Sequence, residues 1–536
     1  MIKVSGIAAA PHHLAASLGA ETLRQGGNAF DAAVVISLAI GVTQPYHSGL
    51  GGGCNSTFLT SAGEAAHVNA RGPAPKDLTR ALFLNSDGSP NYDLVKSGGL
   101  AVTVPSLVAG LVSLHEGRGK LPWRDLCSAV IPLAADGFSA DFRLASVYEN
   151  EGTRNKVARH GAESVFAKPV QEGDWIKQPQ MARTLERLAR NPRDFYEGEV
   201  AKQLVKTVQD NGGVLALDDL RGYQAELTPL YELEYRGWRV LTPGLPTVGS
   251  LQTQLALKIL NRLSLENVGL NSVQHQHLIA EVVRATYAER AKVDSAEAAA
   301  LMIKDEVAAR LAAQIDPHRA TIDFTQDEDA GTSCTSHFCV ADREGNVVSQ
   351  TQTIRSHFGS GVVDAETGVV LNDSVGDFSL RPGEVTTQGI SYRGNYNLLE
   401  PSADPASSQS PIIAIHKESG DIIAAGAAGG GRIVSATLHT LVNQIDFAMD
   451  ARLAVALPRV HSHGPTTYVE AENATRSGLE ALGHQVEVFA PAGIAQTIRR
   501  RGDVWEGGAD GRGPGGVAEV VEQSDSKMTV RRYGYD

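Results

Sequence analysis

The sequence predicts an α+β protein in which layers of helices stack against layers of strands. Helical patterns cover residues 13–25 and 29–42, and most of the stretch from 140 to 330 is also helical in pattern. From residue 335 the pattern changes to short strands and glycine turns, interrupted by one helix near 434–447. Strands with helices on their outside favour stacked α and β layers.

The first two helices have clear boundaries. The helix at 13–25 is amphipathic and ends at Gly26 and Gly27, because glycine readily takes the left-handed conformation that closes many helices. Asn28 can cap the next helix, and Asp31 lies near its positive end. That helix, 29–42, is apolar on nearly every face, so we expect it to be buried between layers.

Further elements follow along the chain. The clearest later helices cover 252–263, 273–291 and 296–313, and Ser295 can cap the last of them. Short strands are expected near 347–353, 411–416, 421–425, 467–471, 485–489 and 517–521. The sequence contains no internal repeat and no long linker of disordered composition, and 536 residues can bury a large core.

The composition is that of an ordinary soluble globular protein, with 42% hydrophobic and 20% charged residues. A net charge of −13 argues against nucleic acid as the main partner. No run of about 18 apolar residues predicts a membrane span, and the first residues do not form a signal peptide. The cysteines form no C-x-x-C pair, so we expect reduced thiols in a cytoplasmic protein, without disulfides or a zinc site. They are Cys54, Cys127, Cys334 and Cys339.

A hairpin follows the threonine at position 335. Residues 336–342 and 347–353 predict two strands, joined by a turn of four residues at 343–346. That turn length places Thr335 opposite Ile354 and leaves Thr353 diagonally within reach. We therefore expect Thr353 to supply a hydroxyl to Thr335.

Thr335 is the candidate nucleophile. A threonine hydroxyl inside a chain is a poor nucleophile, but at an N-terminus the residue's own amine acts as its general base. If the chain breaks between Cys334 and Thr335, one residue supplies both groups. The alternative is that Thr335 and Thr353 are ordinary strand residues, because threonine favours strands.

A second candidate feature is the glycine loop at 426–432, which precedes a helical pattern. Backbone N–H groups at such a position suit an oxyanion, although a tight strand–helix turn is the alternative. The G-x-G-x-x-G run at 511–516 precedes a strand rather than a helix, so it does not indicate a dinucleotide site. His275 and His277 diverge on a helix and indicate a structural role rather than a metal site. No cofactor is expected.

Taken together, these segments resemble the γ-glutamyltransferase family of N-terminal-nucleophile hydrolases. The likeness runs from about residue 7 to 520. Its ordered motifs are residues 25–33 (QGGNAFDAA), 48–53, 71–75 (RGPAP), 104–110, the Thr335 hairpin, 358–361, 371–378 (LNDSVGDF), 405–411, 426–432 and 508–510. The resemblance implies a four-layer αββα sandwich with a largely helical extension in the large subunit.

The resemblance also implies self-cleavage between Cys334 and Thr335. The products would be a large subunit, residues 1–334, and a small subunit, residues 335–536, intertwined in one αββα domain. Thr335 matches the family nucleophile, whose freed amine accepts the hydroxyl proton. Thr353 matches the threonine that orients it.

The remaining site residues come from the same resemblance. Gly429 and Gly430 match the oxyanion hole. Asp377 matches the acid that pairs with the substrate α-amine. The matches to the groups that hold the substrate α-carboxylate are Arg71, Ser407 and Ser408. An Arg fork suits a carboxylate and an Asp suits an ammonium group.

Two positions depart from the γ-glutamyl pattern. Arg355 stands where these enzymes usually have Asn, and Ser374 where they usually have Glu or Gln. Both family residues help to hold the α-amine, and a guanidinium close to an ammonium group repels it by about 1–4 kcal/mol. The alternative is that Arg355 points at Asp377 or at solvent and leaves specificity unchanged.

The expected function is an amide hydrolase or acyltransferase for a γ-glutamyl or similar carboxylate-bearing acyl group, as in glutathione-type substrates. The alternative within the family is an amidohydrolase or acylase for a glutaryl-type or short dicarboxylic monoamide. An uncleaved pseudoenzyme scaffold is a further alternative. We expect residues 379–406 to form a lid, no nucleic-acid or membrane partner, and a subunit pair whose higher oligomeric state stays open.

Overall fold

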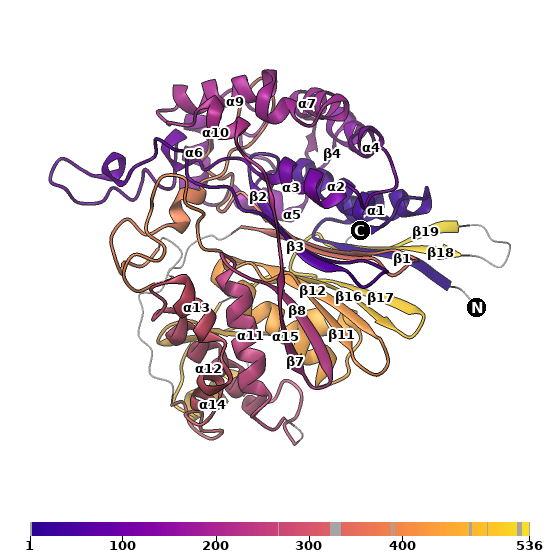
Figure 1. The fold of residues 1–536 in the computed structure, drawn as a ribbon, viewed down its shortest axis with the longest axis vertical. Helices are drawn as coiled ribbons and strands as arrows, with labels where there is room; N and C mark the ends of the chain where they lie inside the picture. Colours follow the sequence, from indigo (N-terminus) through magenta and orange to yellow (C-terminus); the bar gives the residue numbers. More distant parts are fainter. Residues whose placement is uncertain are drawn as a thin grey trace.

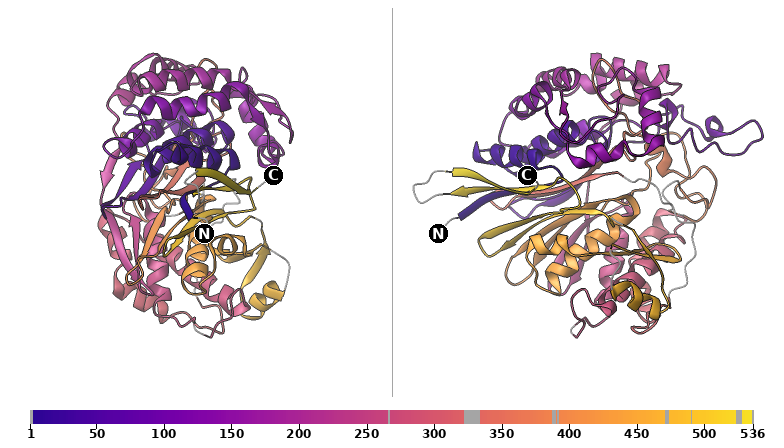
Figure 2. Two further views of the ribbon diagram at one scale, coloured as in Figure 1. Left: turned by 90° about the vertical axis from the view of Figure 1, so that its right-hand side faces the viewer. Right: turned by 180° about the vertical axis from the view of Figure 1, so that it is seen from behind.

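The computed structural model describes residues 3–265, 267–321, 334–386, 390, 392–470, 474–489, 491–522 and 528–534. Two large sheets lie face to face, and helices cover the outer face of each (Figure 1). The other views show the same four layers from the side and from behind (Figure 2). The predicted αββα sandwich is confirmed.

The first sheet has eight strands in the order β19-β18-β1-β9-β10-β2-β3-β6, and each neighbouring pair is antiparallel. The strands are β1 (Lys3–Ala10), β2 (Gly53–Leu59), β3 (Ala65–Ala70), β6 (Glu226–Thr228), β9 (Ser336–Ala341), β10 (Val347–Thr353), β18 (Gly516–Glu522) and β19 (Met528–Gly534). The Thr335 hairpin, β9–β10, therefore lies in the middle of the sheet, between strands from the N-terminal part of the chain.

The second sheet has six strands in the order β17-β16-β12-β11-β8-β7. They are β7 (Leu230–Tyr235), β8 (Trp238–Pro243), β11 (Ile412–His416), β12 (Ile422–Ala428), β16 (Ile494–Arg501) and β17 (Val504–Ala509). Apolar side chains from both sheets pack into one core between them, among them Ile7, Val347, Ile413 and Ile498. This packing holds the hairpin rigidly between the two helical layers.

The strands β7 and β8 correct the expectation that residues 140–330 are mostly helical. In β7, Leu233 and Tyr235 are buried while Glu232 and Glu234 are exposed. This alternation has the period of two that a half-buried strand requires. The signal was therefore present in the sequence, but the helical patterns around it obscured it.

Helices cover the outer face of the first sheet and continue beyond it. The predicted, largely helical extension is therefore confirmed. The helices are α1 (His13–Arg24), α2 (Ala29–Thr43), α3 (Leu107–His115), α4 (Trp123–Asp136), α5 (Phe142–Val147), α6 (Glu151–His160), α7 (Pro179–Arg190), α8 (Asp194–Glu197), α9 (Glu199–Asp210) and α10 (Leu217–Arg221). A two-stranded ribbon, β4 (Phe138–Ser139) and β5 (Trp175–Ile176), joins this layer.

Helices of the opposite layer cover the second sheet. They are α11 (Val248–Leu260), α12 (Val273–Arg290), α13 (Ala296–Met302), α14 (Asp305–Ala312), α15 (Ile433–Ile445), α16 (Ala451–Ala456) and α17 (Ala474–Ala481). A small sheet of β13 (Val460–Ser462), β14 (Thr466–Val469) and β15 (Gln485–Val488) lies beside them.

The helix α2 is buried along its whole length, as its apolar pattern predicts. Its N-cap Asn28 accepts hydrogen bonds from the backbone of Phe30 and Asp31, and Asp31 accepts one from the Asn28 backbone N–H at 2.8 Å. This capping box satisfies the free donors of the first turn. The predicted cap and boundary are confirmed.

The single helix predicted at 296–313 is wrong. Lys304 is extended, with φ −69° and ψ 150°, and separates α13 from α14. Lys258 donates to the Ile303 carbonyl at 2.8 Å and to Asp305 at 2.9 Å. This side chain satisfies a carbonyl that a continuous helix would have bonded internally, which explains the break.

The hairpin register also differs from the prediction. Ala341 pairs with Val347, and the pairing continues to Ser336 opposite Gln352. The turn contains five residues rather than four, because Asp342 accepts hydrogen bonds from the backbone of Glu344 and Asn346 and holds the extra residue. One further step of this register places Thr335 directly opposite Thr353 instead of Ile354.

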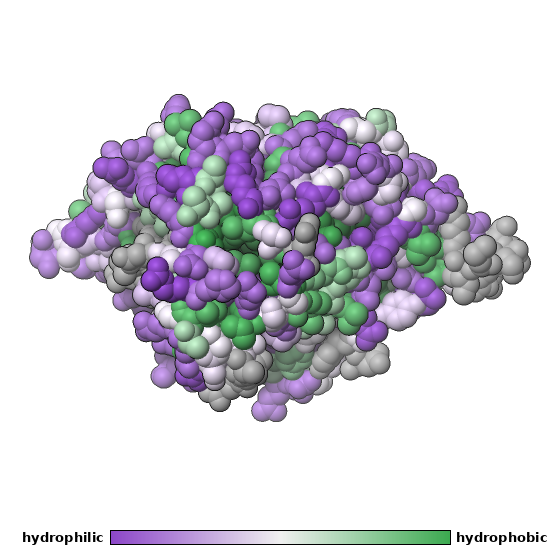
Figure 3. Space-filling view, turned by 90° about the horizontal axis from the view of Figure 1, so that it is seen from below, coloured by the Kyte–Doolittle hydropathy of each residue, from purple (hydrophilic) through white to green (hydrophobic). Residues whose placement is uncertain are grey.

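The surface is largely polar, with apolar residues gathered near the middle of the face in Figure 3. Large exposed apolar side chains, such as Trp175 and Val504, occur on separate elements. No helix among the described residues combines the length and apolar character needed to cross a membrane. The cytoplasmic location stays a prediction.

Candidate active site

The peptide bond between Cys334 and Thr335 lies directly before β9. The hydroxyl of Thr353 donates to the Cys334 carbonyl at 2.8 Å. The hydroxyl of Thr335 contacts the same carbonyl and lies 3.3 Å from that of Thr353. Both threonines are buried. The predicted pair is therefore assembled on the bond that Thr335 would attack.

The backbone of Arg355 supports this arrangement. Its N–H donates to the Thr353 hydroxyl at 2.8 Å, and its carbonyl accepts from the Cys334 N–H at 3.1 Å. Arg355 has φ 82°, which is uncommon for a residue with a side chain. Such strain costs about 1–3 kcal/mol and concentrates at functional sites. The strained residue positions both Thr353 and Cys334.

The side chain of Arg355 is buried among carboxylates. Its Nε donates to Asp377 at 2.9 Å, and its Nη1 donates to Asp373 at 3.1 Å. Its Nη2 donates to the Gly376 carbonyl at 3.0 Å. Burial disfavours the charge, but Asp373 and Asp377 outweigh it and raise the pKa of Arg355. The guanidinium is therefore fixed, and it points at Asp377 rather than at solvent.

Arg71 binds the other oxygen of Asp377. Its Nη2 forms a short ion pair with Oδ2, and its Nη1 donates to Ser374 at 3.3 Å. Both carboxylate oxygens of Asp377 are thus engaged by guanidinium groups. Ser374 thus accepts a hydrogen bond from Arg71, and its role toward a substrate stays a prediction.

These residues surround a narrow cavity of about 30 Å³ beside Thr335. Such a volume holds about one water molecule. The predicted residues on its wall are Arg71, Cys334, Thr335, Thr353, Arg355, Asp377, Ser407, Ser408 and Gly430. The uncleaved chain therefore brings most of the predicted site together but leaves no room for a substrate.

The glycine loop connects β12 to α15 through a short turn of helix, Gly430–Arg432. Gly429 and Gly430 have φ values of 132° and 58°, a region that glycine enters at low cost. Gly430 lines the narrow cavity, whereas Gly429 lines a larger neighbouring one. The backbone geometry therefore requires glycine beside the candidate nucleophile.

Arg290 is a cavity residue that sequence reasoning missed. It lies on α12, is 1% exposed and lines the same narrow cavity. Its Nη1 donates to Ser408 at 3.0 Å and to Gln252 at 2.7 Å, and its Nη2 binds Tyr392. The available signal was an arginine within an otherwise buried helix. It gives the cavity a third guanidinium, which favours an anionic ligand.

A larger cavity of about 740 Å³ adjoins the narrow one and shares Arg355 with it. Its charged wall residues are Asp93, Lys96, Lys156, Arg159, Arg355, Asp373 and Arg432. The basic residues outnumber the acidic ones. This cavity can accept a bulky group that carries negative charge.

Part of the predicted lid covers the site. Thr386, Ile390, Tyr392 and Ala406 line the narrow cavity. Residues 387–389 and 391 lie outside the described residues. The segment 379–406 is thus a wall of the cavity, and its opening stays a prediction.

Three buried histidines, one on β9 and two on α12, make their contacts away from the reacting atoms. His337 points from β9 to Thr351 at 2.8 Å, and burial lowers its pKa to about 3. His277 contacts His484 at 2.7 Å, whereas His275 lies against Phe447. The predicted structural role of His275 and His277 agrees with these separate contacts.

A four-layer sandwich with a threonine at the start of a central strand defines an N-terminal-nucleophile hydrolase fold. Residues 15–520 match the family described as gamma-glutamyltranspeptidase. The glutathione hydrolase proenzyme of Escherichia coli K12 is 30% identical over 511 residues, which cover 92% of this chain and 88% of that protein. Its counterpart from Pseudomonas sp. A14 is 33% identical over 513 residues, with coverage of 91% and 88%. The chain therefore belongs to the γ-glutamyltranspeptidase family of enzymes.

Solved structures show the same relationship. The cephalosporin acylase of Bacillus halodurans superimposes with a TM-score of 0.82 at 24% identity, covering 97% of this chain and 96% of that one, and shares the fold. The γ-glutamyltranspeptidase of Pseudomonas nitroreducens complexed with L-DON has a TM-score of 0.53 at 31% identity, covering 57% and 93%. Enzymes with different named activities thus have this architecture.

Proposed function

We propose that the chain is a precursor that cleaves itself before Thr335 and then hydrolyses an amide whose acyl group carries a carboxylate but no α-amine, as a glutaryl group does. The observation that carries the proposal is the engagement of both Asp377 oxygens by Arg71 and Arg355. Asp377, the residue that would bind an α-amine, is already paired with two guanidinium groups.

Self-cleavage begins when the Thr335 hydroxyl attacks the Cys334 carbonyl carbon. The Thr353 hydroxyl donates to the carbonyl oxygen and stabilises its developing negative charge. The C–N bond breaks, the threonine nitrogen takes up the hydroxyl proton, and an ester joins Cys334 to the Thr335 oxygen. Water then hydrolyses the ester, leaving a Cys334 carboxylate and a free Thr335 amine.

Turnover repeats the same chemistry on a substrate amide. The Thr335 amine accepts the hydroxyl proton as the oxygen attacks the carbonyl, and then donates it to the leaving amine. The proposed oxyanion donors are the backbone N–H groups of Gly429 and Gly430. Water releases the acyl group as a carboxylic acid, or an acceptor amine takes it.

The acyl preference follows from charge. The cavity contains three guanidiniums, from Arg71, Arg290 and Arg355, against the lining carboxylate of Asp377. Ser407 and Ser408 add hydroxyls beside these cations. A terminal carboxylate gains charge-assisted hydrogen bonds there. An ammonium group would instead lie close to the Arg355 cation, and both oxygens of Asp377 would already be bound by arginines.

The leaving group would occupy the larger cavity on the other side of Arg355. Lys96, Lys156, Arg159 and Arg432 line that space. An amine product that carries its own carboxylate would be attracted by these side chains. Cyclic or peptidic amines with an acid group are therefore the proposed leaving class.

A second candidate is γ-glutamyl chemistry with glutathione-type substrates. The relatives named above are glutathione hydrolase proenzymes, and the chain retains Asp377, Arg71 and both serines on the cavity wall. This candidate requires Arg355 to withdraw from Asp377 when an amine enters. The remaining alternative, a pseudoenzyme scaffold without catalytic activity, would leave the precursor uncleaved.

The test compares kcat/KM for glutaryl-p-nitroanilide and γ-glutamyl-p-nitroanilide on the matured protein, with Thr335→Ala as the inactive control. We expect the glutaryl compound to be preferred by at least about tenfold, which corresponds to about 1.4 kcal/mol. A preference for the γ-glutamyl compound would favour the second candidate. A persistent 56.7 kDa band on a denaturing gel would contradict self-cleavage.

A further inference from the structure

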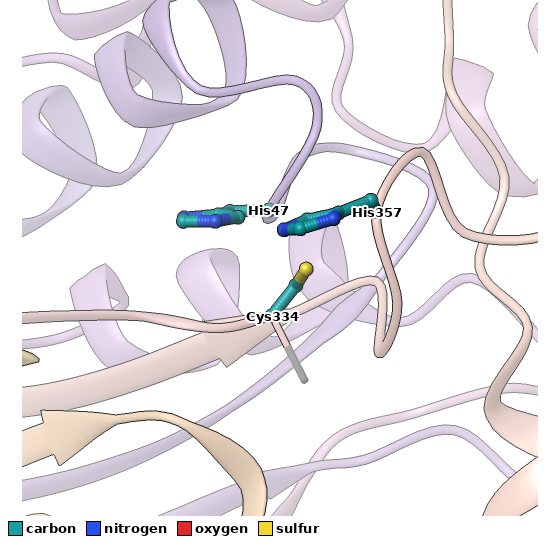
Figure 4. Close-up of side chains that lie close together, drawn as sticks. All are labelled: His47, Cys334 and His357. Carbon is teal, nitrogen blue, oxygen red and sulfur yellow. The ribbon is translucent and has the colours of Figure 1, made fainter. Parts of the chain in front are cut away.

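His47, Cys334 and His357 converge beside the bond that Thr335 would attack (Figure 4). His47 lies after α2, Cys334 directly before β9, and His357 in the loop after β10. One ring nitrogen of each histidine and the sulfur of Cys334 all lie within 4.8 Å of one another. Figure 4 shows the thiol pointing toward the two imidazoles. None of the steps proposed for Thr335 uses these histidines.

The spacing of the three ligand atoms approaches that of a metal site. The two imidazole rings are inclined by only 13°, and their centroids lie 5.6 Å apart. Zinc bonds of about 2.0–2.3 Å to nitrogen and sulfur place neighbouring ligand atoms about 3–4 Å apart. Side-chain rotations that close the group by about 1 Å would therefore complete three zinc bonds.

The backbone holds the three residues in place. The Ile354 N–H donates to the His47 carbonyl at 3.1 Å, and the Phe358 N–H donates to the Tyr46 carbonyl at 3.1 Å. These bonds tie the two histidine loops together on both sides. Among the described residues, Nδ1 of His357 is buried without a hydrogen-bond partner. A metal ion would satisfy such a nitrogen.

The donor atoms favour a thiophilic ion. Burial raises the pKa of the Cys334 thiol and outweighs the opposing effect of Lys156 and Arg143, so a metal that binds here must displace the thiol proton. Magnesium and calcium prefer oxygen ligands, whereas zinc binds imidazole and thiolate well. The nearby Lys156 and Arg143 cations repel any divalent ion, so an ion that gains little from a bond to sulfur is disfavoured further. The residues therefore select the zinc class of divalent cation.

We propose that His47, His357 and Cys334 bind one zinc-class divalent cation in the precursor, with solvent as the fourth ligand, and that the bound ion slows cleavage after Cys334. Binding releases the thiol proton to solvent and forms a metal–sulfur bond. That bond fixes the residue whose carbonyl must become tetrahedral during cleavage.

The ion would act after cleavage as well. Cys334 lines the narrow cavity, so it must move away before a substrate can reach Thr335. Its new carboxylate would add an oxygen ligand next to the thiolate, and the ion would hold this chain end over the nucleophile. The metal binding stands by itself, whereas both effects on maturation rest on the proposed self-cleavage.

The binding test uses full-length Thr335→Ala, which cannot form the threonine ester. After equilibration with zinc and removal of free metal, we expect one zinc per chain by elemental analysis. Adding Cys334→Ser or His357→Gln should weaken zinc binding at least about tenfold, and His47→Gln serves as a second histidine variant. Cys127→Ser changes a buried cysteine on α4 and should retain the zinc.

Cobalt gives a spectroscopic readout of the same site. Thr335→Ala loaded with Co²⁺ should show a sulfur-to-cobalt charge-transfer band that disappears with Cys334→Ser but not with Cys127→Ser. Equal zinc content in Thr335→Ala and its His357→Gln derivative, or a cobalt band that survives Cys334→Ser, would overturn the site.

The maturation test follows the precursor band of the unsubstituted chain with zinc or with a chelator. Zinc should slow cleavage several-fold, the chelator should restore it, and His357→Gln should respond to neither. Equal rates with zinc and chelator would overturn the effect on maturation. A chain that stays uncleaved in both would overturn the proposed function, while zinc binding by Thr335→Ala would still support the metal site.

Discussion

Arg355 donates from Nε to Oδ1 of Asp377 at 2.9 Å, and both side chains are buried. Arg71 binds the second oxygen of the same carboxylate. Removing one member of a buried charge group leaves the other charges uncompensated. The pair therefore links the proposed acyl preference to the local stability of the site, and Asp373 also forms an ion pair with Arg355.

Replacing Arg355 with Asn should shift the acyl preference toward γ-glutamyl substrates. The change removes the cation beside Asp377 and frees one carboxylate oxygen for an α-amine. We expect the ratio of kcat/KM for γ-glutamyl-p-nitroanilide over glutaryl-p-nitroanilide to rise at least about tenfold, equivalent to about 1.4 kcal/mol. The two rates are measured on the same matured preparation.

Arg355→Lys is the charge-retaining control. A lysine keeps a cation near Asp377 but loses the fork geometry. It should therefore retain the glutaryl preference even if total activity falls. An unchanged ratio in Arg355→Asn would show that this guanidinium does not determine acyl choice.

Replacing Thr353 with Val should slow precursor cleavage. The substitution keeps the side-chain shape and removes the hydroxyl that donates to the Cys334 carbonyl at 2.8 Å. Loss of one donor to a developing oxyanion typically costs about 10²–10³ in rate. The rate is measured from the loss of the 56.7 kDa precursor band over time.

Thr351→Val is the matched control on the same strand. Thr351 is also buried, but its hydroxyl contacts His337 at 2.8 Å rather than Cys334. Both variants lose buried hydrogen bonding: Thr351→Val loses the contact with His337, and Thr353→Val loses the bond to the Cys334 carbonyl and the bond from the Arg355 N–H. Equal cleavage rates in the two variants would remove Thr353 from the proposed mechanism.

The mature subunits should remain associated after cleavage. In the first sheet β9 pairs with β1, and β10 pairs with β2. The hairpin that follows the cut is therefore hydrogen-bonded on both sides to strands that precede it. We expect both subunits in one species of 56.7 kDa, or a multiple of it, in native mass spectrometry, and two bands on a denaturing gel. Separate subunits under native conditions would contradict the interleaved sheet. Thr335→Ala, with a single band on both, is the control.

Local patterns predicted the first helices well because the relevant physics is local. The capping box of Asn28 and Asp31 and the apolar faces of α2 are properties of consecutive residues. The hairpin strands were also correct, but the register was displaced by one residue. The extra turn residue is held by the Asp342 side chain, and the pattern of strand residues does not show how many residues the turn contains.

The candidate site was predictable only where motifs carry it. Thr335, Thr353 and Asp377 stand in motif segments, and the structure places all three on one cavity. Arg290 comes from a helix with no such signal and reaches the cavity through packing of α12. The sequence offered two alternatives for Arg355: that it repels an α-amine, or that it points at Asp377 or at solvent and leaves specificity unchanged. The observed ion pair does not separate them, because it both occupies Asp377 and keeps the cation in place.

The protein should lose stability as the pH falls below about 6.5, because several histidines are buried in the neutral form. Burial lowers the pKa of His67 to about 3, and its ring nitrogens contact Thr228 at 2.9 Å and Asn55 at 2.8 Å. An unfolded chain binds a proton at this group near its ordinary pKa of about 6.5, so the unfolded state takes up more protons between pH 6.5 and 3. The contribution of neutral His67 to the stability of the fold is therefore complete above pH 6.5 and is lost progressively as the pH falls toward 3.

At pH 5 the loss attributable to His67 is about 2 kcal/mol, from about 1.5 pH units below its ordinary pKa. Thermal unfolding at pH 7 and pH 5 measures it, and His67→Gln should show a smaller decrease in Tm between these two values than the unsubstituted chain. His318→Gln is the control, because that side chain is exposed. Its pH dependence should match that of the unsubstituted chain. If His67→Gln and His318→Gln have the same slope, protonation of His67 is not coupled to unfolding.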